Sequence, residues 1–274
     1  MLGTAEFSEK FEFLGEEMSI DCVVKNHIAL ITINRTERLN AMDAEHYRAL
    51  SEAWIRVRDD NDIRVAIVTG AGEKSFSTGA DLKSFANKPA PLSEMWLTQR
   101  DQLLNRGLEV WKPVIAAVNG YCLGGGMTLL LGTDIRLAAP HATFGLSEVK
   151  RGFIAGNGGT QRILKQLPHA IAMEILLTGD AMNAETAERW GLINRVVPSE
   201  KLLDEAFAFA KRIAANGPLA VQAAKELAIR GEDMDLATGL RVEQMWNRML
   251  RFSDDAKEGP LAFAERRPAR FKGE

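Results

Sequence analysis

A buried-strand pattern that leads into three consecutive glycines constrains this chain more than any other feature. Residues 114–118 (VIAAV) are all apolar, glycines occupy positions 124–126, and residues 127–131 (MTLLL) have the pattern of a short helix. Glycines at such a junction allow the backbone to approach a ligand closely, because no Cβ is present. The segment does not match a phosphate-binding loop, since no Gly-Lys-Ser/Thr follows, and its spacing differs from the dinucleotide-binding fingerprint. A simple tight turn is the plainer interpretation of the glycines taken alone.

Strand and helix patterns alternate along most of the chain, and this alternation predicts an α/β fold with crossover connections. The predicted strands are 20–24, 28–33, 65–69, 114–118 and 135–139. Helices are predicted from an N-cap at Asp43 to about residue 58, over 93–110 and over 127–131. After Val197-Pro198 only helical patterns remain, at 202–215, 218–230, 235–251 and 254–265.

These patterns divide the chain into three regions. Residues 1–17 have no clear period and form an N-terminal extension, residues 18–198 form the α/β core, and residues 199–274 form a helical C-terminal region. The C-terminal helices are amphipathic and too few to enclose a core of their own. We therefore expect them to pack on the main body or on another subunit.

Composition and charge exclude several classes of function. The formal net charge is −3, which provides no basic surface for nucleic acid. No apolar run reaches the length of a membrane span, and the N-terminus lacks the pattern of a signal peptide. Cys22 and Cys122 belong to no metal-binding or CxxC motif, so we expect two reduced cysteines and a cytoplasmic location.

One carboxylate stands out in the sequence after the glycines. Glu148 lies in Gly-Leu-Ser-Glu-Val, where apolar neighbours would raise its pKa and suit it to proton transfer. The alternative is that Glu148 is an ordinary solvated acid on the surface. A second glycine-containing loop, Ser-Thr-Gly-Ala-Asp over 77–81, also follows a predicted strand. Taken alone, this loop could be an ordinary loop with an Asx turn at Asp81. Two such loops together could form an oxyanion hole, to which each contributes one N–H.

Five segments, taken in order, resemble the crotonase superfamily, also called the enoyl-CoA hydratase/isomerase family. They are NRTERLNAM (34–42), SFSTGADLK (75–83), KPVIAAVNG (112–120), GGTQR (158–162) and LTGD (177–180). The resemblance covers residues 19–272. It implies a spiral of β-β-α units, with a C-terminal all-helical region that assembles trimers or dimers of trimers.

The same resemblance implies an acyl-CoA substrate and roles for particular residues. The N–H groups of Ala80 and Gly125 would hold the thioester oxygen, and Glu148 would move the proton. The residues expected to bind CoA or substrate are Arg38, Ala41, Ser77, Asp81, Leu82, Lys83, Gly124, Phe271 and Lys272. Of these, Phe271 and Lys272 would reach the CoA site of a neighbouring subunit. CoA enters as part of the substrate, and no metal or redox cofactor, nucleic acid or membrane is expected.

The main departure from the family pattern is at position 128. Hydratases of this family usually carry a glutamate there and a second one at the position of Glu148, whereas this chain has Thr128. A threonine hydroxyl can orient a water but is a poor base near neutral pH. We expect hydration of a 2-enoyl-CoA or its reverse. The alternatives are a 3-enoyl to 2-enoyl-CoA isomerase that uses Glu148 alone, an aromatic enoyl-CoA hydratase-lyase, and a catalytically silent CoA-ester-binding scaffold.

Overall fold

The computed structural model describes residues 19–86 and 102–274, so the extension predicted over 1–17 lies outside the described residues. A six-stranded sheet in the order β1-β2-β3-β5-β7-β10 forms its centre. The strands are β1 (Ile20–Lys25), β2 (Ile28–Ile33), β3 (Val65–Gly70), β5 (Val114–Val118), β7 (Ile135–Ala138) and β10 (Arg195–Val196). β1 and β2 form an antiparallel hairpin, and the other neighbours are parallel.

A second, four-stranded sheet lies beside the first in the order β4-β6-β8-β9. Its strands are β4 (Ser75–Ser77), β6 (Tyr121–Leu123), β8 (Thr143–Gly145) and β9 (Met182–Asn183). In three successive units a long strand is followed by a short strand and a helix: β3-β4-α2 (Leu82–Ala86), β5-β6-α4 (Gly125–Leu130) and β7-β8-α5 (Gly159–Gln166). These units confirm the predicted spiral of β-β-α repeats. The strands of the second sheet were not predicted, because segments of two or three residues show no period.

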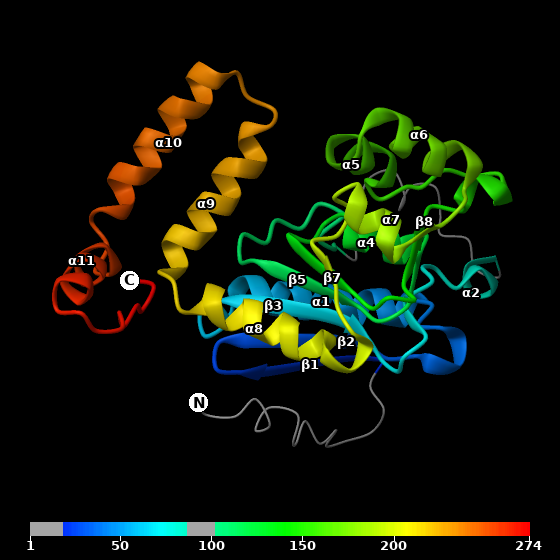
Figure 1. Ribbon diagram of the computed structural model, residues 1–274, viewed down its shortest axis with the longest axis horizontal. Coiled ribbons are helices and arrows are strands. Elements are labelled where there is room, and N and C mark those ends of the chain that lie inside the picture. Colours follow the sequence, from blue (N-terminus) through cyan, green and yellow to red (C-terminus); the bar gives the residue numbers. More distant parts are fainter. Residues whose placement is uncertain (1–18, 87–101) are drawn as a thin grey trace.

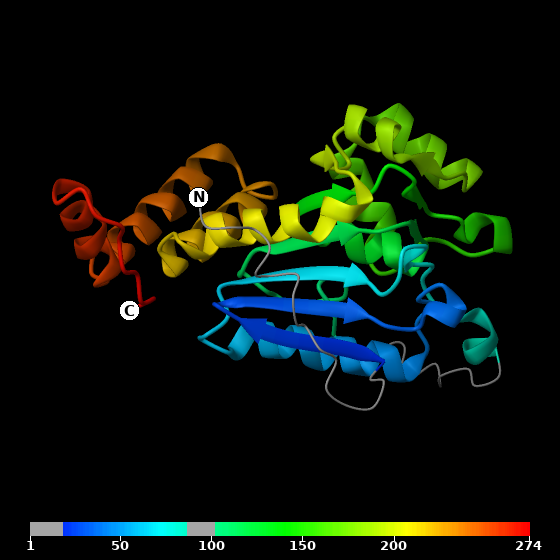
Figure 2. The same ribbon diagram turned by 60° about the horizontal axis from the view of Figure 1, so that its bottom comes forward.

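Helices cover both faces of the six-stranded sheet. The first, α1 (Ala44–Asp59), begins at Asp43, whose side chain accepts hydrogen bonds from the N–H groups of Glu45 and His46 as predicted. Figure 2 shows α1 below the β1–β2 edge, where Trp54 is fully buried. On the other face α8 (Leu202–Ala214) packs against alternate residues of the strands. Burial on both faces explains the continuous apolar sequence of β3 and β5.

The remaining helices extend the body in two directions. Helices α6 (His169–Thr178) and α7 (Ala184–Arg189) follow α5, and three short 3₁₀ helices, η2 (Thr36–Arg38), η3 (Glu148–Arg151) and η4 (Ser199–Lys201), join other elements. Helices α9 (Pro218–Gly231), α10 (Leu236–Leu250) and α11 (Asp255–Ala264) project away from the sheets (Figure 1). Helix α8 therefore belongs with the body, and only the later helices form an extended arm. In the described ranges no helix is long and apolar enough to cross a lipid bilayer.

The predicted helix over 93–110 is wrong in the part that can be compared. Residues 104–107 form a turn and the rest of 102–110 has no regular secondary structure, while the earlier part of the prediction lies outside the described residues. The N–H groups of Arg106 and Leu108 both donate to the Leu103 carbonyl, and Gly107 has a φ of 82°. A left-handed residue cannot continue an α-helix, so buried leucines at helical spacing misled the prediction here.

Candidate active site

Two glycine-containing loops meet at the edge where β4 and β6 end. Gly79 has a φ of 89°, which side-chain-bearing residues rarely adopt, and a Cβ there would collide with the backbone nitrogen of Gly125. A Cβ on Gly125 would in turn lie 3.1 Å from the Cα of Gly79. A Cβ on Gly126 would overlap the Ser77 carbonyl oxygen. The glycines thus serve close contact between loops that are about 45 positions apart in sequence.

Two backbone N–H groups remain without acceptors where these loops meet. The N–H of Met42 donates to Gly79 and the N–H of Asp81 donates to Met42, over 2.7 Å and 2.8 Å. Alternate N–H groups of an extended segment point in opposite directions, so the Ala80 N–H points away from Met42. Gly125 is the first residue of α4, where an N–H has no partner within the helix. Among the described residues neither of these two groups donates to a protein acceptor.

The backbone nitrogens of Ala80 and Gly125 face the same small space. A Cβ built on Gly125 would lie 3.4 Å from the Ala80 nitrogen and 2.9 Å from the Tyr47 hydroxyl oxygen. Two adjacent N–H donors without acceptors are the arrangement that stabilises a developing oxyanion. The sequence did not indicate a role for the buried Tyr47, because its position in α1 is that of an ordinary aromatic residue facing the core. Burial raises the pKa of its hydroxyl to about 12, so it stays protonated at neutral pH.

Glu148 begins η3 and lies over the first glycine of the triplet. Its Oε1 lies 3.6 Å from the position of a Cβ on Gly124, and its buried Oε2 has no hydrogen-bond partner among the described residues. Burial raises the pKa of this carboxyl, and the charge of Arg151 offsets only part of the increase. A carboxylate with poor solvation and an open acceptor oxygen is suited to take up a proton. The surface-acid alternative considered for Glu148 does not fit this burial.

Thr128 is buried, and its hydroxyl makes two hydrogen bonds within the protein. The hydroxyl donates to the Gly125 carbonyl over 3.0 Å and accepts from the amide nitrogen of Asn105, also over 3.0 Å. Its hydrogen is therefore occupied, and the hydroxyl has none left to donate to a ligand. The sequence did not indicate a role for Asn105, because this residue lies within the wrongly predicted helix and belongs to no motif. In the part of the chain that the structure describes, its buried side-chain oxygen has no hydrogen-bond partner.

The residues predicted to line the CoA cleft form two segments beside the glycine loops. Arg38 is exposed at the end of η2, Leu82 and Lys83 are exposed on α2, and Ala41 is half-buried between them in sequence. Asp81 accepts from the Lys83 N–H over 3.1 Å, which confirms the Asx turn. Its other oxygen lies 3.1 Å from Arg35, which holds this loop to the segment before α1.

Ser77, another member of the predicted set, has a structural role that the sequence did not indicate. The buried Ser77 hydroxyl donates to the Asn40 carbonyl over 2.8 Å and accepts from the Gly79 N–H. Asn40, which was not predicted, donates from its amide to the Ser75 carbonyl over 2.6 Å. These bonds fix the shape of the loop that carries Ala80. A direct contact of Ser77 with a ligand stays a prediction.

Phe271 and Lys272 belong to the last four residues of the chain, and Figure 1 shows the C-terminus beside α11, on the side of the molecule opposite α2. The Phe271 carbonyl accepts from Arg64 over 2.6 Å, and the Lys272 N–H donates to Asp255 over 2.7 Å. The structure therefore does not bring these two residues to the glycine loops of their own chain. A role at a neighbouring subunit stays a prediction.

Comparison with known proteins identifies the family. The family model described as enoyl-CoA hydratase/isomerase matches residues 24–274, nearly all of the core and the whole arm. The chain belongs to the enoyl-CoA hydratase/isomerase family. This result confirms the resemblance to the crotonase superfamily seen in the five sequence segments.

Several relatives of this enoyl-CoA hydratase/isomerase family member are similar over most or all of their length. The (E)-benzylidenesuccinyl-CoA hydratase of Thauera aromatica is 44% identical over 256 residues, which cover 93% of this chain and 100% of that protein. The carnitinyl-CoA dehydratase of Salmonella arizonae is 44% identical over 247 residues, 89% of this chain and 94% of that protein. Both names denote addition or removal of water on a CoA ester.

Solved structures agree with this assignment. An enoyl-CoA hydratase from Bacillus anthracis has a TM-score of 0.87 and 35% identity to this chain. The alignment covers 94% of this chain and 100% of the Bacillus anthracis chain. An enoyl-CoA hydratase from Mycobacterium tuberculosis has a TM-score of 0.86 and 39% identity, with coverages of 93% and 99%. The fold of this chain is therefore that of the solved hydratases.

Proposed function

We propose that this protein hydrates a 2-enoyl-CoA, or catalyses the reverse dehydration, with Glu148 as its proton-transferring residue. The observation that carries the proposal is the meeting, among the described residues, of two unpartnered N–H groups with one half-buried carboxylate around the glycine triplet. The relatives named as a hydratase and a dehydratase of CoA esters support the same chemistry.

In the proposed reaction the thioester oxygen accepts hydrogen bonds from Ala80 and Gly125. Water attacks C3 of the enoyl group while Glu148 removes one of its protons, and the π electrons of C2=C3 move towards the thioester oxygen. The two N–H groups stabilise the resulting enolate. Glu148 then delivers its proton to C2, so both parts of one water are added. The reaction needs no metal or redox cofactor, because the thioester itself accepts the electron pair.

Isomerisation of a 3-enoyl-CoA is the second candidate, and one observation favours it. Thr128 stands where the family often has a second acid, and its hydroxyl is occupied. One carboxylate suffices to carry a proton between C4 and C2, and this reaction requires no water. An aromatic hydratase-lyase would use the same groups on an aryl-substituted ester.

A panel of CoA esters distinguishes these reactions. Purified protein should be incubated with a short aliphatic 2-enoyl-CoA, a 3-enoyl-CoA and an aryl-substituted 2-enoyl-CoA, and the products analysed by mass spectrometry. We expect a 3-hydroxyacyl-CoA from at least one 2-enoyl ester. Conversion of the 3-enoyl ester alone would identify an isomerase. The absence of any turnover that depends on Glu148 would identify a silent CoA-ester binder.

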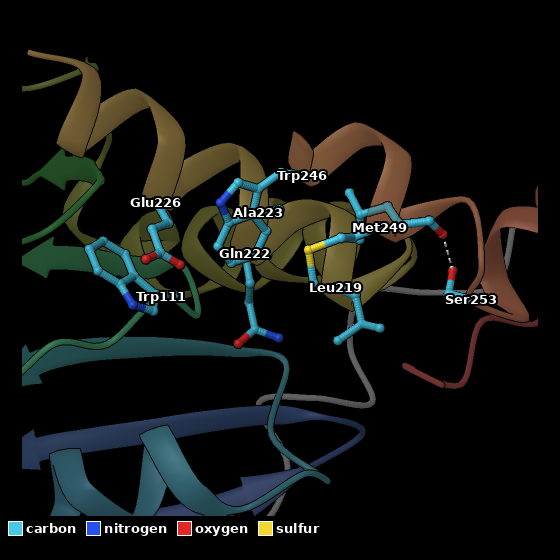
Figure 3. A pocket seen from close by; sticks show the side chains of 9 residues that line it. Trp111, Leu219, Gln222, Ala223, Glu226, Trp246, Met249 and Ser253 are labelled. Atoms are coloured by element: carbon cyan, nitrogen blue, oxygen red, sulfur yellow. Dashed lines mark hydrogen bonds between the residues drawn. The ribbon is translucent and has the colours of Figure 1, made fainter. Parts of the chain in front are cut away.

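We propose further that the helical arm joins copies of this chain into a trimer or hexamer. None of the residues of α10, all of which the structure describes, is buried. Met249 and Phe252 are 65% and 85% exposed. Between α9 and α10 lies a cavity of about 320 Å³ with a largely apolar lining that includes Trp111, Leu219, Trp246 and Met249 (Figure 3). A second copy of this chain would cover these apolar groups and bring Phe271 and Lys272 towards a neighbouring CoA site.

Charges introduced on the arm test this assembly. In the variant Met249→Glu/Phe252→Glu we expect a lower sedimentation coefficient than in the wild type, because a subunit contact cannot bury two unpaired carboxylates. The matched control is Val23→Asp, at an exposed position on β1, which should sediment like the wild type. An unchanged oligomer in the double variant, or a monomeric wild type, would refute the proposed role of the arm.

A further inference from the structure

Of the buried side-chain polar atoms without partners in the described ranges, two flank the first turn of α4. They are Oδ1 of Asn105 and Oε2 of Glu148, and both are hydrogen-bond acceptors. Buried acceptors are rarely left unpaired in proteins, so each of them calls for a donor from a ligand or a water.

The orientation of the Asn105 amide follows from the hydrogen-bond network. The Thr128 hydroxyl uses its hydrogen on the Gly125 carbonyl, so it can only accept from Asn105. The amide nitrogen of Asn105 must therefore face Thr128, which leaves the amide oxygen free. The backbone of Asn105 is also held, because its carbonyl accepts from Arg162 over 3.3 Å.

The two acceptors belong to side chains that are held at neighbouring positions of the start of α4. Glu148 lies over Gly124 and Asn105 is bound to Thr128, and the Thr128 N–H donates to the Gly124 carbonyl over 3.0 Å. Gly124 and Thr128 thus lie four residues apart on one face of the start of α4, about 6 Å along its axis. Two acceptors that share one water lie roughly 4.5 Å from each other.

We propose that Asn105 is a second catalytic residue, whose Oδ1 holds one hydrogen of the attacking water while Glu148 takes the other. Thr128 is the positioning residue that fixes the amide. In this arrangement the oxygen of the water is directed at C3. As this oxygen forms its bond to C3, Glu148 removes one hydrogen of the water and that O–H bond breaks. Asn105 only accepts a hydrogen bond and stays neutral throughout. The inference rests on the proposed hydration and explains how it proceeds with one carboxylate.

A comparison of hydration with proton exchange separates this role from a merely structural one. In D₂O, Glu148 and the two N–H groups should exchange the C2 hydrogens of butyryl-CoA, a saturated ester to which water cannot add. We expect Asn105→Ala to slow hydration of the best 2-enoyl-CoA by about 10- to 100-fold and to leave the exchange rate within a factor of two to three of wild type. Thr128→Val should likewise lower the rate of hydration relative to the rate of exchange.

Gln166 offers a matched control on α5. Its amide nitrogen donates to the Leu131 carbonyl over 3.0 Å and its buried oxygen has no partner, as in Asn105. Gln166→Ala should leave the ratio of hydration to exchange unchanged. A crystal structure of the wild type should further show a water within hydrogen-bonding distance of Oδ1 of Asn105 and of a Glu148 oxygen.

The outcomes separate this inference from the proposed function. Hydration by Asn105→Ala at the wild-type rate, equal losses of hydration and exchange, or no water between the two acceptors would each overturn the role of Asn105 alone. A wild-type protein that exchanges the C2 hydrogens but hydrates no ester would overturn the proposed hydration, and the role of Asn105 with it.

Discussion

Glu148→Gln is expected to slow hydration of the best 2-enoyl-CoA by roughly a hundredfold or more, because the amide cannot accept a proton from water. Glutamine has almost the size of glutamate and fits the same half-buried position at the start of η3. The exchange of C2 hydrogens should fall with it, since both reactions use the same base. Steady-state kinetics on purified protein measure the effect.

The melting temperature supplies the control for this variant. Burial raises the pKa of Glu148 in the folded protein, so the carboxyl ionises more readily in the unfolded chain. Its ionisation therefore lowers the free energy of unfolding as the pH rises above the ordinary value of 4.5. Glu148→Gln should melt at a higher temperature than wild type at pH 7, and the difference should vanish below pH 4.5. A folded variant with near-normal turnover would exclude Glu148 as the base.

Removal of the Gly125 N–H should cost about 3 kcal/mol of transition-state stabilisation, a loss of more than a hundredfold in kcat/KM. Gly125→Pro deletes this donor at the first position of α4, where the φ of proline is compatible with a helix. Any residue other than glycine also places a Cβ 2.9 Å from the Tyr47 hydroxyl oxygen. The steric effect must therefore be separated from the loss of the donor.

Gly125→Ala separates the two effects, because it adds the Cβ but keeps the N–H. We expect alanine to reduce kcat/KM less than proline does, and the ratio between the variants to measure the contribution of the donor. Circular dichroism verifies that each variant is folded. Equal activities of folded Gly125→Ala and Gly125→Pro would mean that this N–H does not hold the thioester oxygen.

The long elements of the fold could be predicted from the sequence, because the helices have a clear apolar period and the buried strands are continuous apolar runs. The helix after Asp43, the strand over 114–118 and the four C-terminal helices lie within one or two residues of their predicted limits. The short second sheet could not be predicted, since its strands are too brief to show alternation. The turn over 102–110 was mistaken for helix because four of its buried apolar residues have helical spacing.

The candidate site was predicted only where a residue belongs to a local motif. Glu148 and the two glycine loops could be found, because a glycine cluster and an acid among apolar neighbours are visible in the sequence. Tyr47, Asn40 and Asn105 could not, since their roles depend on contacts between segments that are distant in the chain. The state of the Thr128 hydroxyl likewise depends on Asn105, 23 positions away.

Hydration in ¹⁸O-labelled water tests the central claim most directly. The best 2-enoyl-CoA of the panel should be incubated with wild type and with Glu148→Gln, and the products analysed by mass spectrometry. We predict that wild type forms a 3-hydroxyacyl-CoA with one ¹⁸O atom at C3, and that Glu148→Gln forms it at least a hundredfold more slowly. A product without the label, a shifted double bond in its place, or equal rates in the two proteins would contradict hydration by Glu148.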